Sequence, residues 1–152
     1  MFGQMMDRPL LISSIMRHAE LQHPRQEIVS LTADNPRHRC TFSEAFARAR
    51  KLANALQRLG IRHGDRVATL AWNDYRHFEI YYGVSCSGFV CHTINPRLFD
   101  DQIVYIVNHA SDRLLFVDTT FLPLVKRLAP QFPKDCRFVL LSEAEKIGRA
   151  HV

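Results

Sequence analysis

The stretch VATLAWNDYRHFEIYYGVSCSGFVCHTI, residues 67–94, contains two apolar runs separated by a segment with helical spacing. The first run, Val67–Trp72, is too continuously apolar for a strand with one face in water, so we expect both of its faces to be covered. A helix is predicted over Tyr75–Ser87 and a second strand over Phe89–Ile94. Because a helix between two buried strands usually joins parallel neighbours, this stretch predicts a parallel sheet.

The same alternation continues on both sides of this stretch. Upstream, Thr41-Phe42-Ser43-Glu44 matches a capping box that precedes apolar residues at helical spacing, and Gly60 follows as a left-handed C-cap. The remaining predicted strands are Glu27–Leu31, His38–Phe42, Leu114–Val117 and Arg137–Leu141, and the remaining predicted helices are Asp101–Asn108, Phe121–Ala129 and a short amphipathic one ended by Pro24. We therefore expect an α/β fold, mainly a parallel sheet with helices on both faces.

Four polar residues lie near the carboxyl end of the predicted strand over Phe89–Ile94, namely His92, Thr93, Asn95 and Arg97. Ligands commonly bind at this edge of an open α/β sheet. Asn95 is also explained as a turn former, and His92 and Thr93 as ordinary strand residues. Position alone therefore assigns none of them to a site.

Arg97 is the best binding candidate of the four, because a guanidinium can meet a phosphate or a carboxylate. A surface salt bridge to Asp100 or Asp101 is the competing interpretation. We also expect Asp100 to cap the following helix, and Asp101 to complement the positive end of its dipole.

Other chemical patterns have simpler interpretations. Gly83–Gly88 has the glycine spacing of a phosphate loop, but no Lys-Ser/Thr pair follows it, and its place at a helix end opposes anion binding. His109 and Asp112 suggest acid–base chemistry, yet they also fit a polar turn before a strand. Cys91 and His92 should point to opposite faces of their strand, which argues against a shared metal site. The cysteines lack metal-finger spacing and are expected to be buried reduced thiols in a cytoplasmic protein: Cys40, Cys86, Cys91 and Cys136.

With 152 residues, 47% of them hydrophobic, the chain is long enough for one domain with a sizeable core. Its 20 Lys+Arg against 15 Asp+Glu would favour acidic partners, but six basic residues form what reads as a solvated helix face: Arg48, Arg50, Lys51, Arg58, Arg62 and Arg66. The aromatic residues have the spacing of a helix packed on a sheet and predict no nucleic-acid binding: Trp72, Tyr75, Phe78, Tyr81 and Tyr82. No uncharged run is long enough to span a membrane.

A family resemblance adds what spacing does not show. The stretch TFSEAFARARKLANALQRLGIRHGDRVATLAWNDYRHFEIYYGVSCSGFVCHTINPRLFDDQIVYIVNHASDRLLFVD, residues 41–118, resembles the N-terminal region of acyl-CoA synthetases of the AMP-binding, adenylate-forming superfamily. WNDYRHFEIYYGVSCSGFVCHTINPRLF and QIVYIVNHA look like the branch with medium-chain and long-chain fatty-acid CoA ligases and methylthiopropionate CoA ligases. The similarity runs from about Leu10 to about Glu145; Asp100 departs from it, because the family pattern has proline there.

The resemblance implies a partial N-terminal domain of the adenylate-forming fold. It also implies a two-step reaction in which ATP activates a fatty or related carboxylate to acyl-AMP, and coenzyme A then displaces AMP, with Mg²⁺ and basic side chains neutralising phosphate charge. The family's phosphate loop, its adenine and acyl pocket motifs and its catalytic lysine are expected downstream. No residue here is therefore assigned a catalytic, cofactor-binding or metal-binding role. The fragment alone is expected to be inactive, while peripheral membrane contact and a homo-oligomer are compatible with the complete enzyme.

Residues 1–145 are expected to be an incomplete N-terminal part of an AMP-binding domain. The last seven residues, KIGRAHV (Lys146–Val152), depart from the resemblance and match the translation of a common sequencing-adaptor sequence. We therefore expect residues 146–152 to be a non-native tail. The alternative is a genuine short nucleotide-binding or interaction module derived from the ligase fold, without catalysis.

Overall fold

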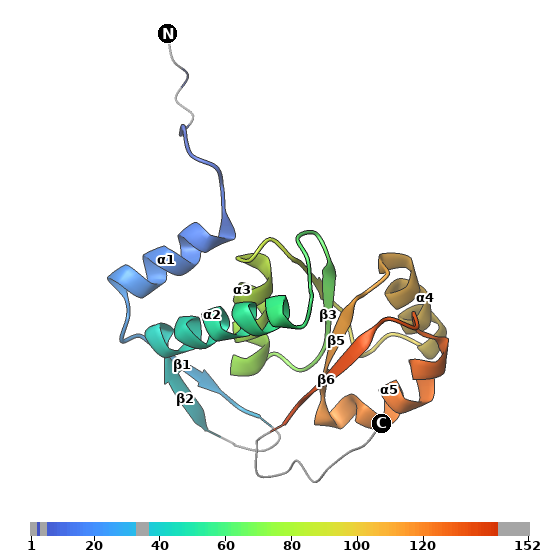
Figure 1. Cartoon of the computed structure of the whole chain (residues 1–152). Helices are drawn as coiled ribbons and strands as arrows, with labels where there is room; N and C mark the ends of the chain where they lie inside the picture. The colour runs from blue at the N-terminus through green and yellow to red at the C-terminus, as the bar shows by residue number, and fades with distance from the viewer. Residues whose placement is uncertain (1–2, 4–5, 33–36, 143–152) are drawn as a thin grey trace.

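The computed structural model describes Gly3, residues 6–32 and residues 37–142. Within these residues a four-stranded sheet has the order β4-β3-β5-β6, and all neighbouring strands are parallel. Its strands are β3 (Arg66–Leu70), β4 (Val90–Thr93), β5 (Leu114–Asp118) and β6 (Arg137–Leu141). The predicted parallel sheet is confirmed, with β3 and β5 at its centre (Figure 1).

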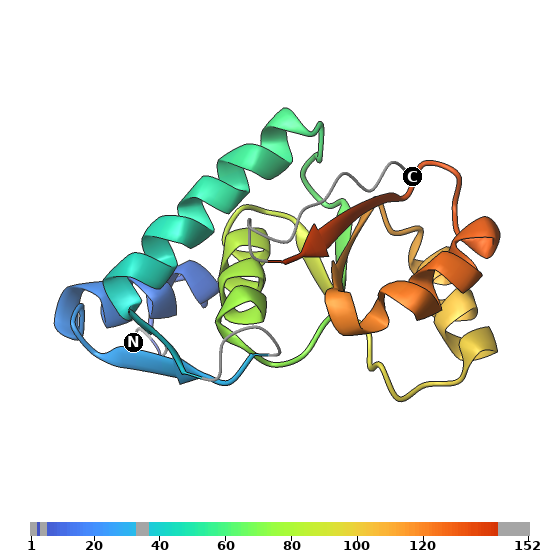
Figure 2. The same ribbon diagram turned by 90° about the horizontal axis from the view of Figure 1, so that it is seen from below.

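Helices cover both faces of this sheet, as the apolar strands require. Figure 2 shows them on its two sides: α2 (Phe42–Arg58) and α3 (Tyr75–Ser85) on one, and α4 (Asp100–Ala110) and α5 (Leu122–Leu128) on the other. Successive residues of β5 alternate between the two cores: Leu114 and Phe116 pack toward α2 and α3, whereas Leu115 and Val117 pack toward α4 and α5. All five residues of β5 are buried, so its continuous apolar run follows from two covered faces.

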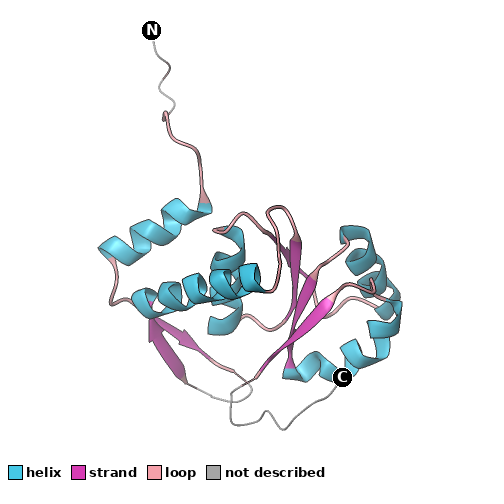
Figure 3. Cartoon of the chain, viewed as in Figure 1, coloured by secondary structure: helices cyan, strands magenta, loops and turns pink. Residues whose placement is uncertain are grey.

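A separate antiparallel pair, β1 (Glu27–Ser30) and β2 (His38–Thr41), lies beside the first layer of helices (Figure 3). The predicted capping box starts α2 immediately after β2: Thr41 Oγ1 accepts from Glu44 N at 3.3 Å, and Glu44 Oε2 accepts from Thr41 N at 2.8 Å. Gly60, with φ +78°, then lets the chain turn toward β3. Both predictions are confirmed.

The α2–α3 interface is close-packed and largely aromatic. Phe46 lies at its centre, with ring centroids 5.9 Å from Phe78 and 5.2 Å from Tyr82. At Gly83 the backbones approach so closely that a Cβ would stand 2.9 Å from the carbonyl oxygen of Ala49. Phe78 and Tyr82 of α3 therefore pack on α2, whereas Ile80 and Val84 of the same helix pack on the sheet.

Several predicted boundaries shift. The helix predicted over Tyr75–Ser87 ends at Ser85, and the one predicted over Phe121–Ala129 is divided into α5 and two flanking 3₁₀ turns, Thr119–Phe121 and Ala129–Gln131. Pro123 and Pro130 stand near these divisions, where a missing amide donor is tolerated. The tail prediction for residues 146–152 lies outside the described residues.

The capping role predicted for Asp100 is wrong, because Asp100 is already the first residue of α4 and Phe99 is the N-cap. The exposed amide of Phe99 donates instead to Gln102 Oε1 at 3.1 Å, while Asp101 Oδ1 accepts from Gln102 N at 2.9 Å. Asp100 is drawn to α5, where its carboxylate pairs with Arg127 at 2.8 Å. A tertiary ion pair therefore replaces the local cap.

Across the described residues, none of the helices has the length and apolar character needed to cross a bilayer.

Candidate functional site at the carboxyl edge of the sheet

The carboxyl ends of β3, β4 and β5 meet at one edge of the sheet, as parallel pairing requires. Two adjoining hollows lie there, with volumes of about 530 Å³ and about 380 Å³. Asn73, His77 and Thr93 line both of them, so these side chains stand at the boundary between the two spaces. This edge is the candidate site of the described part of the chain.

His77 is held in one orientation by neutral partners. Its Nε2 lies 3.0 Å from Thr69 Oγ1, and its Nδ1 lies 3.2 Å from Asn73 Oδ1. Because the amide oxygen of Asn73 only accepts, Nδ1–H is the donor, and Nε2 accepts from the Thr69 hydroxyl. Burial lowers the pKa of His77 and outweighs the opposing charge of Asp74. The imidazole is therefore neutral at pH 7, with both of its nitrogens engaged.

A buried ionic cluster of Asp74, Arg76 and Asp118 lies at the same edge, between the start of α3 and the end of β5. Arg76 Nε and Nη2 donate to Asp74 Oδ2 at 3.0 and 2.9 Å, and Nη2 lies 3.8 Å from Asp118 Oδ2. Asp74 also caps α3, accepting from the amides of Arg76 and His77, while Asp118 ends β5 and accepts from the amide of Thr120. The cluster thus ties β5 to the start of α3 and orients the loop that carries Asn73.

The structure places three of the four predicted edge residues at the smaller hollow, which Thr93, Asn95 and Arg97 line. Asn95 Oδ1 accepts from the amide of Arg97 at 3.0 Å, which confirms its turn-forming role. Asp100 pairs with Arg127, and no ion pair among the described residues joins Arg97 to Asp101, so the competing interpretation of a salt bridge from Arg97 to Asp100 or Asp101 is wrong. Among the described residues Arg97 takes part in no ion pair and remains exposed, so its guanidinium is available to an anion.

His92 does not belong with these residues. Its Nδ1–H donates to the carboxylate of Asp112, 2.8 Å from Oδ2 and 3.0 Å from Oδ1, and Asp112 precedes the amino end of β5. Asp112 is fully buried, whereas the His92 side chain is 24% exposed. Asp112 therefore links β4 to the start of β5. Because its partner is His92, Asp112 does not form the acid–base pair with His109 that the sequence suggested. His109 instead stacks on Tyr105.

Replacing His92 with alanine should lower the free energy of unfolding by about 2 kcal/mol, because the Asp112 carboxylate loses its hydrogen-bonded partner while staying buried. The partial exposure of His92 keeps the effect below that of a wholly buried pair. Urea unfolding of the two chains at pH 7 measures the difference. The control is His109→Ala on the exposed face of α4, for which less than about 0.5 kcal/mol is expected. Equal losses in both variants would contradict the pairing.

Neither thiol nor metal chemistry is supported at this edge. Cys91 packs in the core under α2 and α3, and burial raises its pKa to about 11, so it stays a thiol at neutral pH. In the portion of the chain that the structure describes, no three His, Cys, Asp or Glu side chains gather as a metal site would require. Trp72, just after β3, has its ring centroid 4.9 Å from that of Phe121, so it packs against the 3₁₀ turn that follows β5.

Sequence reasoning missed the ionic cluster and the environment of His77. Asn73-Asp74 directly before a helix is an N-cap signature, and Asp118 closes an apolar run, as binding residues do in α/β sheets. These two signals could have placed Asp74 and Asp118 at the edge. Their shared partner Arg76 follows Asp74 by only two residues, but nothing near it in the sequence indicates that it also meets Asp118 at the end of β5.

The AMP-binding enzyme family matches residues 16–150. The 3-methylmercaptopropionyl-CoA ligase of Ruegeria lacuscaerulensis is 54% identical over 141 residues, which are 93% of this chain and 26% of that protein. The medium-chain-fatty-acid–CoA ligase of Ectopseudomonas oleovorans is 47% identical over 142 residues, with coverage of 93% and 26%. The chain thus spans about a quarter of the length of these curated relatives.

Solved structures agree with this likeness. The anthranilate CoA ligase AuaEII, in complex with anthranoyl-AMP, superposes with a TM-score of 0.77 at 25% identity, over 89% of this chain and 26% of that one. A Rhodopseudomonas palustris protein assigned to the long-chain-fatty-acid CoA ligases superposes with a TM-score of 0.76 at 23% identity, over 88% of this chain and 33% of that one. This second likeness bears on the fold alone. Since the family match covers most of the residues and the parallel sheet has the same architecture, the chain belongs to the AMP-binding enzyme family.

Proposed function

We propose that this chain is the N-terminal part of a longer acid–thiol ligase, which activates a fatty or related carboxylic acid with ATP and transfers it to coenzyme A. The observation that carries the proposal is the 54% identity to a 3-methylmercaptopropionyl-CoA ligase across 93% of the chain. The 47% identity to a medium-chain-fatty-acid–CoA ligase supports the same reaction with a longer acid.

The proposed reaction has two balanced steps. A carboxylate oxygen of the acid attacks the α-phosphorus of ATP, and pyrophosphate leaves with the electron pair of the broken P–O bond. The thiolate of coenzyme A then attacks the acyl carbon, and AMP leaves as the thioester forms. Activation is needed because a carboxylate oxygen is a poor leaving group, whereas AMP is a good one.

We propose that the described residues hold the carboxyl edge in place and do not themselves carry out the reaction. Mg²⁺ does not fit them, because the two carboxylates nearest the edge, Asp74 and Asp118, are buried and face Arg76. Gly83–Gly88 is not proposed as a phosphate cradle, because Gly83 packs against α2 and the His63 side chain lies beside Gly88, where a Cβ would stand 2.6 Å from it. Arg97 is the side chain best placed to meet an anionic group, because it is exposed beside the smaller hollow.

Ligase activity should appear in the longer protein and be absent from the 152-residue chain, since catalysis needs groups that the described residues do not supply. The measurement follows AMP and acyl-CoA by chromatography, with 3-methylmercaptopropionate, octanoate and hexadecanoate as the acids, and compares ATP binding to both chains by calorimetry. Thioester and AMP formed in equal amounts, by the longer protein only, is the expected result.

The control for this comparison is the longer protein without coenzyme A, which should stop at the acyl-adenylate and release pyrophosphate without AMP. ATP binding by the 152-residue chain alone would favour the short nucleotide-binding module instead. The ligase proposal is contradicted if the longer protein forms no acyl-adenylate with any of the three acids. Cytoplasmic residence is part of the proposal and is supported by the cysteines, because all four are free thiols.

A further inference from the structure

The smaller hollow at the carboxyl edge has a polar lining that contains no carboxylate. Its polar side chains are those of Trp72, Asn73, His77, Thr93, Asn95 and Arg97. The nearby carboxylates of Asp74, Asp100 and Asp101 lie outside this lining, and those of Asp74 and Asp100 pair with arginines. A ligand in the smaller hollow therefore meets no negative side chain among the residues that line it.

Hydrogen bonds fix the orientation of two side-chain amides in this lining. Asn73 Oδ1 accepts from His77 Nδ1–H at 3.2 Å, and Asn95 Oδ1 accepts from the backbone amide of Arg97 at 3.0 Å. Within the described residues, the Nδ2 group of neither asparagine has a hydrogen-bond partner, and both residues are exposed. Because Nδ2 can only donate, each asparagine offers a donor to a ligand while its oxygen is engaged by the protein.

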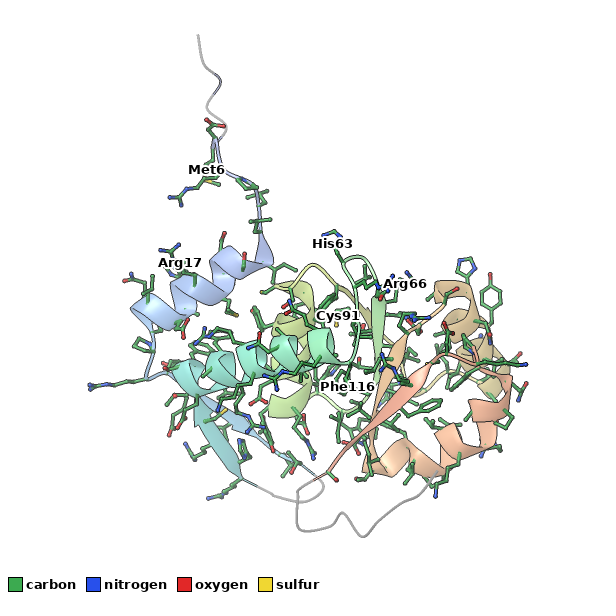
Figure 4. All side chains as sticks on the ribbon, in the orientation of Figure 1. Met6, Arg17, His63, Arg66, Cys91 and Phe116 are labelled. Carbon is green, nitrogen blue, oxygen red and sulfur yellow. The ribbon has the colours of Figure 1, made fainter. Side chains whose placement is uncertain are left out.

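Arg97 adds a guanidinium that has no structural task. In the part of the chain that the structure describes, its side chain meets neither a carboxylate nor a carbonyl oxygen. Arg66, which Figure 4 labels at the amino end of β3, differs in this respect: it donates to the carbonyl oxygens of Ala110 and Ser111 at 2.6 and 2.8 Å. Arg66 thus satisfies the last carbonyl groups of α4, whereas the donors of Arg97 remain for a ligand.

We propose that the smaller hollow binds the phosphate group of an organic phosphate ester, with Asn73, Asn95 and Arg97 as the donors. A phosphate monoester presents three terminal oxygens that accept hydrogen bonds, so it matches three separate donor groups better than the two oxygens of a carboxylate do. The volume of the hollow, about 380 Å³, lies within the range of about 300–1,000 Å³ that is usual for small-molecule sites.

The larger hollow gives the rest of the ester a place to lie. It adjoins the smaller one at Asn73 and Thr93, which line both. Beyond this boundary its lining includes the apolar side chains of Ile28, Phe78 and Tyr81. An ester with its phosphate beside Arg97 can therefore place its less polar part against these side chains.

The inference rests on the proposed function for the two esters to be tested, coenzyme A and ATP. Calorimetry of the longer protein without the acid substrate gives the dissociation constant of each ester, because no turnover then takes place. Arg97→Met should weaken binding of the ester that occupies the smaller hollow by about tenfold, through the loss of charge-assisted hydrogen bonds at an exposed site. Arg97→Lys keeps the charge but not the planar fork, so its loss should be smaller.

Asn95→Asp tests the direction of the hydrogen bond. The new carboxylate can still accept from the backbone amide of Arg97, so the turn is kept, but an anionic oxygen replaces the Nδ2 donor. Binding of the same ester should therefore fall by at least about tenfold. Circular dichroism of each variant confirms that it is folded before binding is measured.

The matched control is Arg17→Met on α1 (Ile12–Gln22), an exposed arginine that Figure 4 shows away from the sheet; both dissociation constants should stay unchanged. The ester whose constant changes in Arg97→Met and Asn95→Asp is the one that occupies the hollow. The inference is overturned if these variants bind both esters as tightly as the wild type, or if the wild type binds neither. It is also overturned if Arg17→Met weakens binding equally, or if only octanoate binding falls.

This result and that of the ligase test can be told apart, because the dissociation constants need no catalysis. A longer protein that forms acyl-CoA with unchanged constants in the variants would keep the ligase proposal and reject the phosphate site. One that loses ester binding in Arg97→Met but forms no acyl-adenylate as wild type would do the reverse.

Discussion

Replacing Arg76 with methionine should lower the free energy of unfolding by about 3–5 kcal/mol, because two carboxylates would stay buried without their cation. The side chains of Asp74 and Asp118 are each 3% exposed, and that of Arg76 is 9% exposed. Burial lowers the pKa of Arg76, but the hydrogen bond and the charge of Asp74 outweigh burial and raise it overall. The cation is therefore stabilised by its partners, and each partner depends on it. Urea unfolding followed by circular dichroism measures the loss.

The matched control is Arg97→Met at the same edge of the sheet, where the arginine is exposed and less than about 0.5 kcal/mol should be lost. A second variant separates charge from volume. Asp74→Asn and Asp118→Asn, added to Arg76→Met, keep both capping oxygens but remove the unpaired charges. This triple variant should be more stable than Arg76→Met alone. If it is less stable, buried charge is not the cause of the loss.

The elements that could be predicted are those whose causes are local in the sequence. The capping box at Thr41 and the left-handed Gly60 involve residues at most three or four apart, and both are confirmed. The parallel sheet is confirmed as well, because a strand buried on both faces needs a continuous apolar run such as that before Asp118. Local sequence patterns were therefore sufficient to predict the α/β fold class.

The long-range pairings around the candidate site could not be predicted, because they join residues that only the folded chain brings together. His92 and Asp112 are 20 residues apart, and nothing near either residue indicates the other. Asp100 shows the same limit from the other side. Its position favours a helix cap, yet the ion pair with Arg127 of α5 takes the carboxylate elsewhere. Tertiary partners compete with local ones for the same side chain, and the hydrophobic periodicity of the sequence does not show which partner it will bind.

A valine at Gly83 should cost about 2–4 kcal/mol of unfolding free energy, because α2 and α3 touch there through their backbones. A Cβ at this position would stand 2.9 Å from the carbonyl oxygen of Ala49 and 3.0 Å from Leu52 Cδ2. The leucine tip can rotate away, but the carbonyl belongs to the backbone of α2 and moves only with the helix. The side chain of Arg48, joined to Glu79 at 2.7 Å, resists that movement.

The smaller variant Gly83→Ala separates two effects on the free energy of unfolding, because helix propensity predicts an increase and packing predicts a decrease. At an exposed helical glycine, alanine stabilises by about 1 kcal/mol. At Gly83 the contact with Ala49 should outweigh this gain and leave a net loss of about 1 kcal/mol. Gln57→Val on the exposed side of α2 measures the cost of a β-branched residue without a clash, about 0.5 kcal/mol. Stabilisation by Gly83→Ala, seen as a higher urea midpoint, would mean that the two helices can separate without loss. In the proposed ligase, Gly83→Val should reduce the amount of folded enzyme while leaving kcat per folded molecule unchanged, since Gly83 lies at the contact between α2 and α3 and lines neither hollow at the carboxyl edge.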